Sequence, residues 1–384
     1  MTEWIECTLD KLGEIVGGAT PSTKCEDYYG GSIPWITPKD LSSFKGRYIT
    51  SGERNITEKG LASCSAQMMP KDAVLFTSRA PIGYVAIASQ SVCTNQGFKS
   101  IVVNEKADPL FVYYLLKYNK DAIEAMGSGT TFKEVSGKTM RAVKVRIPLD
   151  VSYQKRIAAV LDSLDTKIEN NERINDNLQQ QVATLFKAWF VDLAPFDGTM
   201  PPNWTISTLD DVTEMGAGGD KPKEFSPVKT PLCPYPIYSN GINDYGLYGY
   251  TSEPKIKVES VTVSARGTIG YVCLRHIPYV PIVRLVTLIP DTKVLSAKYL
   301  YLYLRQLHIT GTGTTQQQLT VPDFRKTEIV IPDKNTMDSF TETVTPLFER
   351  IWTNENENTK LAKVRDTLLP KLMSGEIDVS AVQL

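Results

Sequence analysis

The sequence repeats itself, and this duplication constrains the fold more than any other feature. Three motifs recur in the same order, at offsets of 200, 187 and 184 residues. They are WxxxTLDxxxE at residues 4–14 and 204–214, RxxIGYV at 79–85 and 266–272, and GxGTT at 127–131 and 311–315. In both copies an arginine and an Ile-Pro pair follow the third motif. The chain is therefore a tandem duplication of a unit of roughly 190 residues.

Each unit of the repeat ends in a stretch with the apolar rhythm of a coiled-coil helix. Apolar residues recur there in alternating steps of four and three, which is the heptad pattern. The middle of each stretch carries two asparagines at seam positions, 183 residues apart between the copies. The predicted seam consists of Leu164, Ile168, Asn171, Asn175 and Leu178 in the first stretch and of Leu347, Ile351, Asn354, Asn358 and Leu361 in the second.

A tandem duplicate tends to fold with pseudo-twofold symmetry, so we expect the two helices to pack antiparallel. Asn171 would then face Asn358, and Asn175 would face Asn354. Buried asparagines at seam positions fix the register at some cost in stability. A solvated kink in two unrelated helices stays open as the alternative.

Two charged residues complicate the predicted seam. Arg365 takes a seam place, and we expect the neighbouring Val364 to cover the seam there. Asp165 and Lys167 resemble part of a nuclease motif, but no Pro-Asp partner precedes them. A solvated helix face is the better interpretation of these two residues.

Ahead of each helix the sequence indicates short strands and one helix. Strands are expected at residues 73–76, 84–88, 101–103 and 143–147, and helices at 109–126 and 297–307. The proline-rich link at 194–203 separates the copies. The predicted fold class is α+β, with mixed α/β domains at 1–150 and 196–335 and long helices at 151–195 and 336–384 that pack as an antiparallel coiled coil.

Composition excludes several classes of protein. With 42% hydrophobic and 22% charged residues the chain has an ordinary globular composition. No apolar run is long enough to span a membrane, and the first residues are acidic where a signal peptide is basic, so we expect a cytoplasmic protein. The net charge of −1 argues against a protein that coats DNA. That total hides two weakly basic α/β blocks alternating with two acidic helical ones.

Signatures of catalysis are missing from the sequence. The segment Gly137, Lys138, Thr139 lacks the first glycine of a phosphate-binding loop, because Phe132 stands there. No GxGxxG motif and no Asn-Pro-Pro-Tyr or Asp-Pro-Pro-Tyr motif occurs. Only two histidines and no CxxC pair are available for metal or acid–base chemistry. We therefore predict no catalytic residue, no metal site and no cofactor on this chain.

Particular motifs resemble the specificity (S) subunit of Type I restriction-modification systems, over essentially the whole chain. Residues 17–22 (GGATPS) with 33–40 (IPWITPKD) resemble the entrance to a target recognition domain, and 202–209 resemble the start of a second one. Residues 186–192 (FKAWFVD) resemble the close of the central conserved helix. The most specific match is 368–377 (LLPKLMSGEI), which resembles the C-terminal signature. In the second block, residues 216–221 depart from the entrance motif, and recognition domains of this family vary with their target sequence.

The resemblance implies a targeting subunit without catalysis. Each recognition domain would read one half of a bipartite double-stranded DNA target. The antiparallel helices would set the unread gap and dock two methyltransferase (M) subunits, through which two restriction (R) subunits join. S-adenosylmethionine, ATP and Mg²⁺ would be bound by those partners. About 35 helical residues would span roughly 50 Å, enough to hold half-sites on successive turns of one DNA face.

Candidate DNA contacts follow from the chemistry of base recognition, in which Arg and Lys suit guanine, and Asn and Gln suit adenine. Arg79 and Arg266 occupy matched positions, which favours a shared backbone contact, with an internal salt bridge as an equal alternative. The loop at 316–318 (QQQ), where the first copy has 132–134 (FKE), suits readout, and a plain polar loop is the alternative. The candidates are Lys39, Arg47, Arg54, Arg79, Thr131, Lys133 and Lys138 in the first block and Lys221, Lys223, Asn240, Asn243, Tyr248, Arg266, Gln316, Gln317 and Gln318 in the second.

Two other functions stay open. The chain could be the specificity subunit of a modification-only or fused nuclease-methyltransferase system, in which a genome neighbourhood would lack a restriction subunit. It could also be a duplicated protein-binding scaffold, and loss of all duplex binding in the presence of a methyltransferase would favour that reading.

Overall fold

The computed structural model describes residues 3–129, 133–311 and 318–380, and the chain divides into two compact units. Unit 1 comprises Met1–Arg173 and Asn354–Leu384, and unit 2 comprises Ile174–Thr353. Each unit combines one α+β domain, here domain 1 or domain 2, with one part of each long helix. Within the described ranges, no helix has the length and apolar character that crossing a membrane requires.

Domain 1 combines a five-stranded sheet of order β2-β9-β6-β7-β4, a three-stranded sheet β5-β3-β8 and the antiparallel pair β1-β10. Its strands are β1 (Trp4–Thr8), β2 (Gly13–Gly17), β3 (Tyr29–Ile36), β4 (Tyr48–Ile49), β5 (Arg54–Ile56), β6 (Val74–Phe76), β7 (Val85–Ala88), β8 (Cys93–Thr94), β9 (Lys99–Val103) and β10 (Lys144–Pro148). Its helices are α1 (Pro38–Ser42), α2 (Glu58–Ala62), α3 (Pro109–Tyr118), α4 (Lys120–Ala125) and α5 (Gly137–Ala142).

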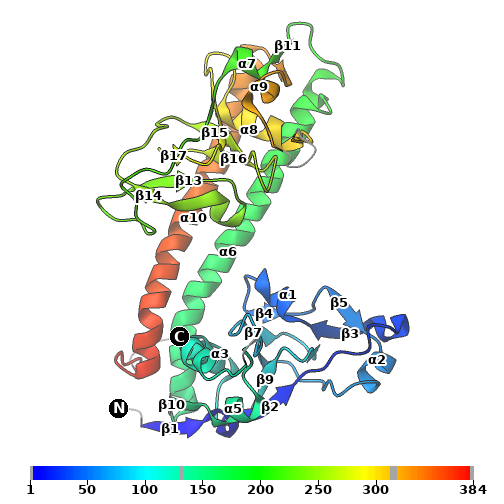
Figure 1. The fold of residues 1–384 in the computed structure, drawn as a ribbon, viewed down its shortest axis with the longest axis vertical. Helices are drawn as coiled ribbons and strands as arrows, with labels where there is room; N and C mark the ends of the chain where they lie inside the picture. The colour runs from blue at the N-terminus through cyan, green and yellow to red at the C-terminus, as the bar shows by residue number, and fades with distance from the viewer. Residues whose placement is uncertain (1–2, 130–132, 312–317, 381–384) are drawn as a thin grey trace. The chain divides into compact units, whose positions relative to one another are not determined.

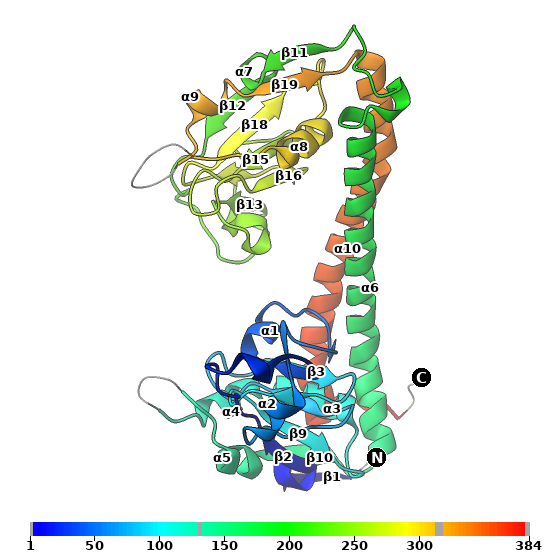
Figure 2. The same cartoon turned by 90° about the vertical axis from the view of Figure 1, so that its right-hand side faces the viewer.

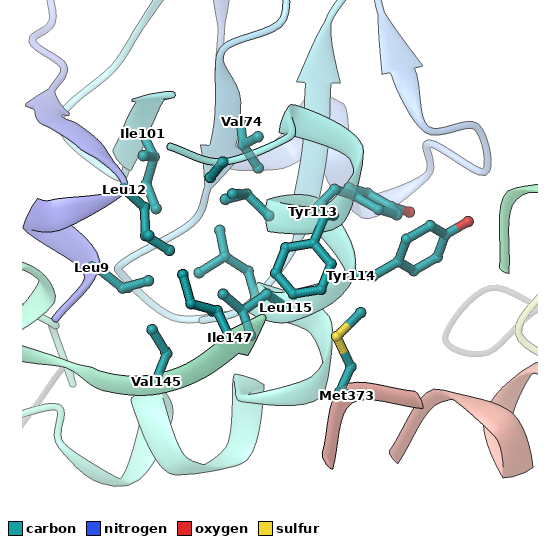
Figure 3. Close-up of a cluster of buried hydrophobic side chains, with 14 of the residues drawn as sticks. Leu9, Leu12, Val74, Ile101, Tyr113, Tyr114, Leu115, Val145, Ile147 and Met373 are labelled. Atoms are coloured by element: carbon teal, nitrogen blue, oxygen red, sulfur yellow. The ribbon is translucent and has the colours of Figure 1, made fainter. Parts of the chain in front are cut away.

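Helix α3 carries the core of domain 1. It begins where the Asp108 side chain accepts a hydrogen bond from the Phe111 amide (3.0 Å), with Pro109 in the first turn. Its six residues from Phe111 to Leu116 are all buried, because one side packs on β6 and β7 and another on the long helices (Figure 1). Figure 3 shows Tyr113, Tyr114 and Leu115 of α3 among Val74, Ile101 and Met373.

Domain 2 repeats this design with fewer elements. A four-stranded sheet of order β12-β18-β15-β16 corresponds to the five-stranded sheet, β14-β13-β17 to the three-stranded sheet, and β11-β19 to the terminal pair. The elements are β11 (Thr205–Thr208), α7 (Leu209–Val212), β12 (Thr213–Ala217), β13 (Tyr235–Tyr238), β14 (Leu247–Thr251), β15 (Ser260–Val263), β16 (Val272–Arg275), β17 (Val280–Pro281), β18 (Val286–Pro290), α8 (Ala297–Gln306), α9 (Val321–Phe324) and β19 (Glu328–Ile331).

Helix α8 takes the place of α3 in domain 2 and packs on β15, β16 and β18 (Figure 2). An aromatic cluster joins it to the long helices, with ring centroids of Phe190 and Tyr299 4.9 Å apart and those of Phe190 and Phe340 4.8 Å apart. Buried aromatic side chains supply much apolar area for few residues. The domain is therefore anchored to its helices by packed aromatic rings.

The long helices are α6 (Val151–Phe190, 40 residues) and α10 (Lys334–Ser374, 41 residues). Within unit 1 they run antiparallel, since Asn171 meets Asn358 whereas Asp165, earlier in α6, meets Arg365, later in α10. Unit 2 gives the same direction, with Asn175 beside Ile351 and Phe186 beside Phe340. The antiparallel packing of the two helices is confirmed in each unit.

The predicted asparagine register is confirmed for the first pair. Asn171 is buried, and its Nδ2 donates to Asn358 Oδ1 (2.9 Å) and to Glu357 Oε2 (2.7 Å). Asn175 is also buried and donates to the Ile351 carbonyl (3.2 Å). Asn354 belongs to unit 1 and Asn175 to unit 2, so the predicted contact between these two residues stays a prediction. Ile351 is buried and Leu164, Ile168, Leu178, Leu347 and Leu361 are half-buried, as seam residues should be.

Some local expectations needed correction. The helix predicted over 109–126 is broken at Asn119, whose side chain turns back to the Leu115 carbonyl (2.8 Å) and ends α3. The mixed α+β class is confirmed for both domains. The division into consecutive parts at 1–150, 151–195, 196–335 and 336–384 stays a prediction, and each compact unit draws on separate stretches of the chain.

Candidate nucleic-acid interface

In domain 1, loops from distant parts of the sequence meet at one edge of the sheets. The loop after β2 joins the β8–β9 loop, because the Ala19 amide donates to the Thr94 carbonyl (3.0 Å) and Thr20 bonds Gln96. Gly18 lies so close that a Cβ there would stand 2.2 Å from the Thr94 carbonyl oxygen. Only glycine fits this approach, which explains Gly18 of the 17–22 motif.

A second pair of loops completes this surface of domain 1. The Ser78 amide donates to the Gly97 carbonyl (2.7 Å), and the Val135 amide donates to the Ser78 carbonyl (2.8 Å). Arg79 Nε then lies 3.0 Å from Glu134 Oε2, and Lys99 Nζ lies 3.6 Å from Glu134 Oε1. Two cations therefore surround one carboxylate on the loop that follows the GxGTT motif.

Domain 2 assembles the corresponding loops with different side chains. The Gly218 amide donates to the Leu285 carbonyl (2.9 Å), and the Leu319 amide to the Ala265 carbonyl (3.0 Å). Arg266 Nη2 donates to Gln318 Oε1 (2.9 Å). Arg266 is the counterpart of Arg79 and Gln318 that of Glu134, so the paired positions are retained while the carboxylate becomes an amide.

We call these joined loops of either domain the loop platform. In domain 1 it comprises residues 17–22, 78–83, 95–99, 127–129 and 133–134, and in domain 2 residues 217–221, 265–270, 282–285, 311 and 318. The platform exposes backbone, cations and amides, which are the groups that contact phosphates and base edges in nucleic acids.

Most of the predicted contact residues of domain 1 are exposed. The Lys39 ammonium pairs with Glu53 (2.7 Å), and this hydrogen bond raises the pKa of Lys39. The Arg54 guanidinium lies over the Tyr29 ring, 4.2 Å from its centroid. Lys133 and Lys138 are exposed, and Lys133 belongs to the loop platform. Thr131 lies outside the described residues.

The predicted contact residues of domain 2 form two groups. Lys221 lies over the Phe225 ring at 4.4 Å, and Tyr248 packs against the same ring at 5.6 Å. Lys223 and Asn243 are also exposed. Lys223 lies between β12 and β13, and Asn243 lies between β13 and β14. Arg266 and Gln318 belong to the loop platform, as described above. Gln316 and Gln317 lie outside the described residues.

Arg47 is a correction to the predicted contacts. Its side chain is buried, with Nε and Nη2 3.1 and 3.0 Å from the two Glu169 carboxylate oxygens and Nη1 bonded to Asp162. Burial lowers the pKa of Arg47, but the Glu169 hydrogen bond and the Asp162 charge outweigh it, so the net pKa is raised. A base contact would require breaking this network, so Arg47 binds domain 1 to α6 instead.

Asn240 is the second correction. Its Nδ2 donates to the Val283 carbonyl (2.6 Å) and its Oδ1 accepts from the Ala265 amide (2.7 Å). Both ends of the amide are thus engaged with backbone, and the side chain holds two loops of the platform together. It positions the surface rather than reading a base.

The charged seam residues also differ from expectation. Asp165 is buried rather than solvated, and its carboxylate accepts from Tyr114 Oη (2.8 Å) and Arg365 Nη1 (2.7 Å). Val364 is exposed and does not cover the seam. Arg365 enters the seam because Asp165 is there to pair with it.

Two cations of the loop platforms were missed by the sequence reasoning. Lys99 begins β9 and reaches Glu134, and Arg284 lies between β17 and β18. A charged residue interrupting the apolar run 280–290 was the available signal for Arg284. No comparable signal marks Lys99, because its partner is distant in the sequence.

Two similar α+β domains, each with a loop platform and each packed on its part of a helix pair, define a tandem recognition-domain protein. Residues 1–180 and 201–364 match the family described as the Type I restriction modification DNA specificity domain. The chain belongs to this family and is a specificity subunit with two such domains.

Known relatives support the assignment. The chain is 33% identical over 407 residues to the Type I restriction enzyme MjaIX specificity subunit of Methanocaldococcus jannaschii, covering 98% of this chain and 94% of that protein. It is 25% identical to the HindI specificity subunit of Haemophilus influenzae, over 73% and 80% of the two chains. The crystal structure of the S subunit from M. genitalium has the same fold, with a TM-score of 0.66, 18% identity and coverage of 97% and 96%.

Proposed function

We propose that this chain is the non-catalytic specificity subunit of a Type I restriction-modification complex, in which each domain reads one half of a bipartite double-stranded DNA target. Family membership supports the general role. The division of labour between the domains rests on the loop platforms, which share backbone contacts but differ in their side chains.

The observation that carries the proposal is the pair Arg79–Glu134 and its counterpart Arg266–Gln318. An arginine present at the matched position of both domains, on corresponding loops, suits a phosphate contact common to both half-sites. The change from carboxylate to amide beside the arginine alters which base edges the loop can bind. A carboxylate only accepts hydrogen bonds, whereas an amide both donates and accepts them. Two such platforms would read two different short sequences.

The helices would set the unread gap between the half-sites. At 1.5 Å per residue, 40 helical residues correspond to about 60 Å of helix, somewhat longer than the roughly 50 Å expected from the heptads. The polar seam formed by Asn171 and Asn358 would fix their register and so the length of the gap.

The partners in this proposal follow from family membership. Two M subunits would dock on the helices and carry S-adenosylmethionine, and two R subunits would join through them and carry ATP and Mg²⁺. The assembly would act on DNA in the cytoplasm. Because the total charge of this chain is −1, part of the phosphate contact would come from these partners.

The proposal is tested by selection of duplexes with the chain purified together with the methyltransferase of its own genome. From a random library, the complex should enrich two short sequence blocks separated by a fixed unread gap. Enrichment of a single uninterrupted block would contradict reading by two domains. If an intact complex retained no duplex, the protein-binding scaffold would be favoured. The modification-only alternative is tested separately, by adding restriction subunits to the complex.

A further inference from the structure

The β17–β18 loop of domain 2 has an unusual backbone. Val283 and Arg284 have φ angles of 53° and 59°, which place both in the left-handed region. A β-branched residue rarely adopts this conformation, so the surrounding structure must hold it in place.

Hydrogen bonds from neighbouring loops hold this turn. The Val283 amide donates to the Gly219 carbonyl (2.8 Å), and the Arg284 amide donates to the Gly218 carbonyl (2.9 Å). The Asn240 amide group bonds the Val283 carbonyl on one side and the Ala265 amide on the other. The turn is therefore fixed beside the loop that carries Arg266.

The consequence is an exposed arginine on a fixed support. Arg284 is exposed, and among the ion pairs of residues 3–129, 133–311 and 318–380 none includes it. The other arginine of this platform, Arg266, bonds Gln318. Arg284 therefore presents its guanidinium to solvent from the surface on which we place the DNA.

Domain 1 has no side chain at the corresponding position. Because β8 and β9 correspond to β17 and β18 at an offset of 187 residues, Gly97 is the counterpart of Arg284. A Cβ on Gly97 would lie 2.8 Å from Pro38 Cγ, and its carbonyl accepts the Ser78 amide. The corresponding turn has no side chain at this position in domain 1 and carries a cation in domain 2, as a difference in target would require.

We propose that Arg284 is a specificity-determining residue of domain 2, which recognises a guanine in the second half-site, and that Asn240 positions it. This inference rests on the proposed function. A guanidinium on a rigid turn can donate two parallel hydrogen bonds to guanine O6 and N7 in the major groove. Asn240 acts through the backbone of Val283 and touches no base.

The test uses the complex of the full chain with its methyltransferase, and compares Arg284→Ala, Arg284→Lys and Asn240→Ala with wild type. Lys293→Ala is the matched control, because Lys293 is exposed beyond the opposite end of β18 and its loss removes the same charge. Methylated motifs are mapped in DNA from expressing cells, and affinity is measured on duplexes with single base-pair changes. Thermal unfolding confirms that each variant is folded.

Arg284→Ala should relax one guanine-bearing position in one half of the motif, with discrimination there reduced about 5- to 150-fold. Arg284→Lys should keep affinity but lose much of that discrimination, since an ammonium cannot form the bidentate contact. Asn240→Ala should relax the same position, and Lys293→Ala none.

Two results would overturn the inference. Equal weakening on all duplexes with a shallower salt dependence would show a phosphate contact, and an unaltered motif would show no contact. If wild type itself produced no bipartite motif, the proposed function would fail instead, so the two failures are distinguishable.

Discussion

Arg79 Nε lies 3.0 Å from a carboxylate oxygen of Glu134, and the same carboxylate is approached by Lys99 at 3.6 Å. At the matched place in domain 2, Arg266 bonds an uncharged amide. The internal salt bridge is therefore present in domain 1, whereas Arg266 makes no ion pair with any residue of domain 2 that the structure describes. The two platforms differ by one negative charge at the point where both carry an arginine.

Glu134→Gln should strengthen duplex binding, because it leaves Arg79 and Lys99 without their carboxylate partner and available to phosphates. If one more phosphate is neutralised, the slope of log K against log salt should steepen by about 0.9. Glu105→Gln is the control, since Glu105 is an exposed carboxylate beyond the other end of β9. Titrations at several salt concentrations check this, and equal behaviour of the two variants would contradict it.

Arg47→Met should destabilise the protein strongly, because it leaves Asp162 and Glu169 half-buried without their cation. Removal of one partner from a buried ion pair costs about 3–5 kcal/mol. Arg54→Met removes an exposed arginine stacked on Tyr29 and should cost about 0.5–1 kcal/mol. Denaturant unfolding measures both, and similar losses for the two variants would refute the buried network.

Asn171 and Asn358 should be energetically coupled. Asn171→Leu should cost about 1–3 kcal/mol, because it removes the donor to Asn358 Oδ1 and leaves that oxygen at the seam without its hydrogen bond. Replacing both by leucine should recover most of that loss, since two apolar residues fit a heptad seam. A double-mutant cycle by urea unfolding measures the coupling; strictly additive effects would show that the two amides act independently.

His276 should make domain 2 less stable in mild acid. Burial, together with the charges of Arg275 and Lys298, lowers the pKa of His276 to about 4, and its ring stacks on Trp352 at 4.0 Å. The unfolded chain takes up this proton below about pH 6.5. Stability is therefore complete above that pH and falls as the pH drops from about 6.5 to 4.

The effect is expected to be modest, because the residue remains exposed to solvent at one side. After allowance for solvent screening we expect about 1 kcal/mol. His276→Phe keeps the stack on Trp352 but cannot be protonated, so its unfolding free energy should fall less between pH 7 and pH 5. Identical slopes for both proteins would remove His276 as the cause.

Sequence reasoning succeeded where the signal is periodic or repeated. The duplication predicted two domains of one design, and the heptads predicted the helices and the contact of Asn171 with Asn358. These features depend on spacing within one segment or on symmetry between two. The helix break at Asn119 lay beyond this reasoning, because a local side-chain hydrogen bond decides it.

The charged contacts could not be predicted from spacing. Arg47 is exposed or buried according to whether Asp162 and Glu169 lie opposite it, more than a hundred positions along the chain. Asp165 and Arg365 have the same dependence on tertiary pairing. For the interface, residue chemistry gave exposed Lys133 and Lys221 but also buried Arg47, because charge alone does not indicate which face of a domain a side chain occupies.

The most direct test of the account is a methylation map after exchange of one domain. Residues 203–335 are replaced by the corresponding segment of a specificity subunit with a different target, and the chimera is expressed with the same methyltransferase. We predict that wild type gives a two-part motif with a fixed gap and that the chimera changes one half while the other half and the gap stay the same. Change in both halves, or a single uninterrupted motif for either protein, would contradict two independent half-site readers.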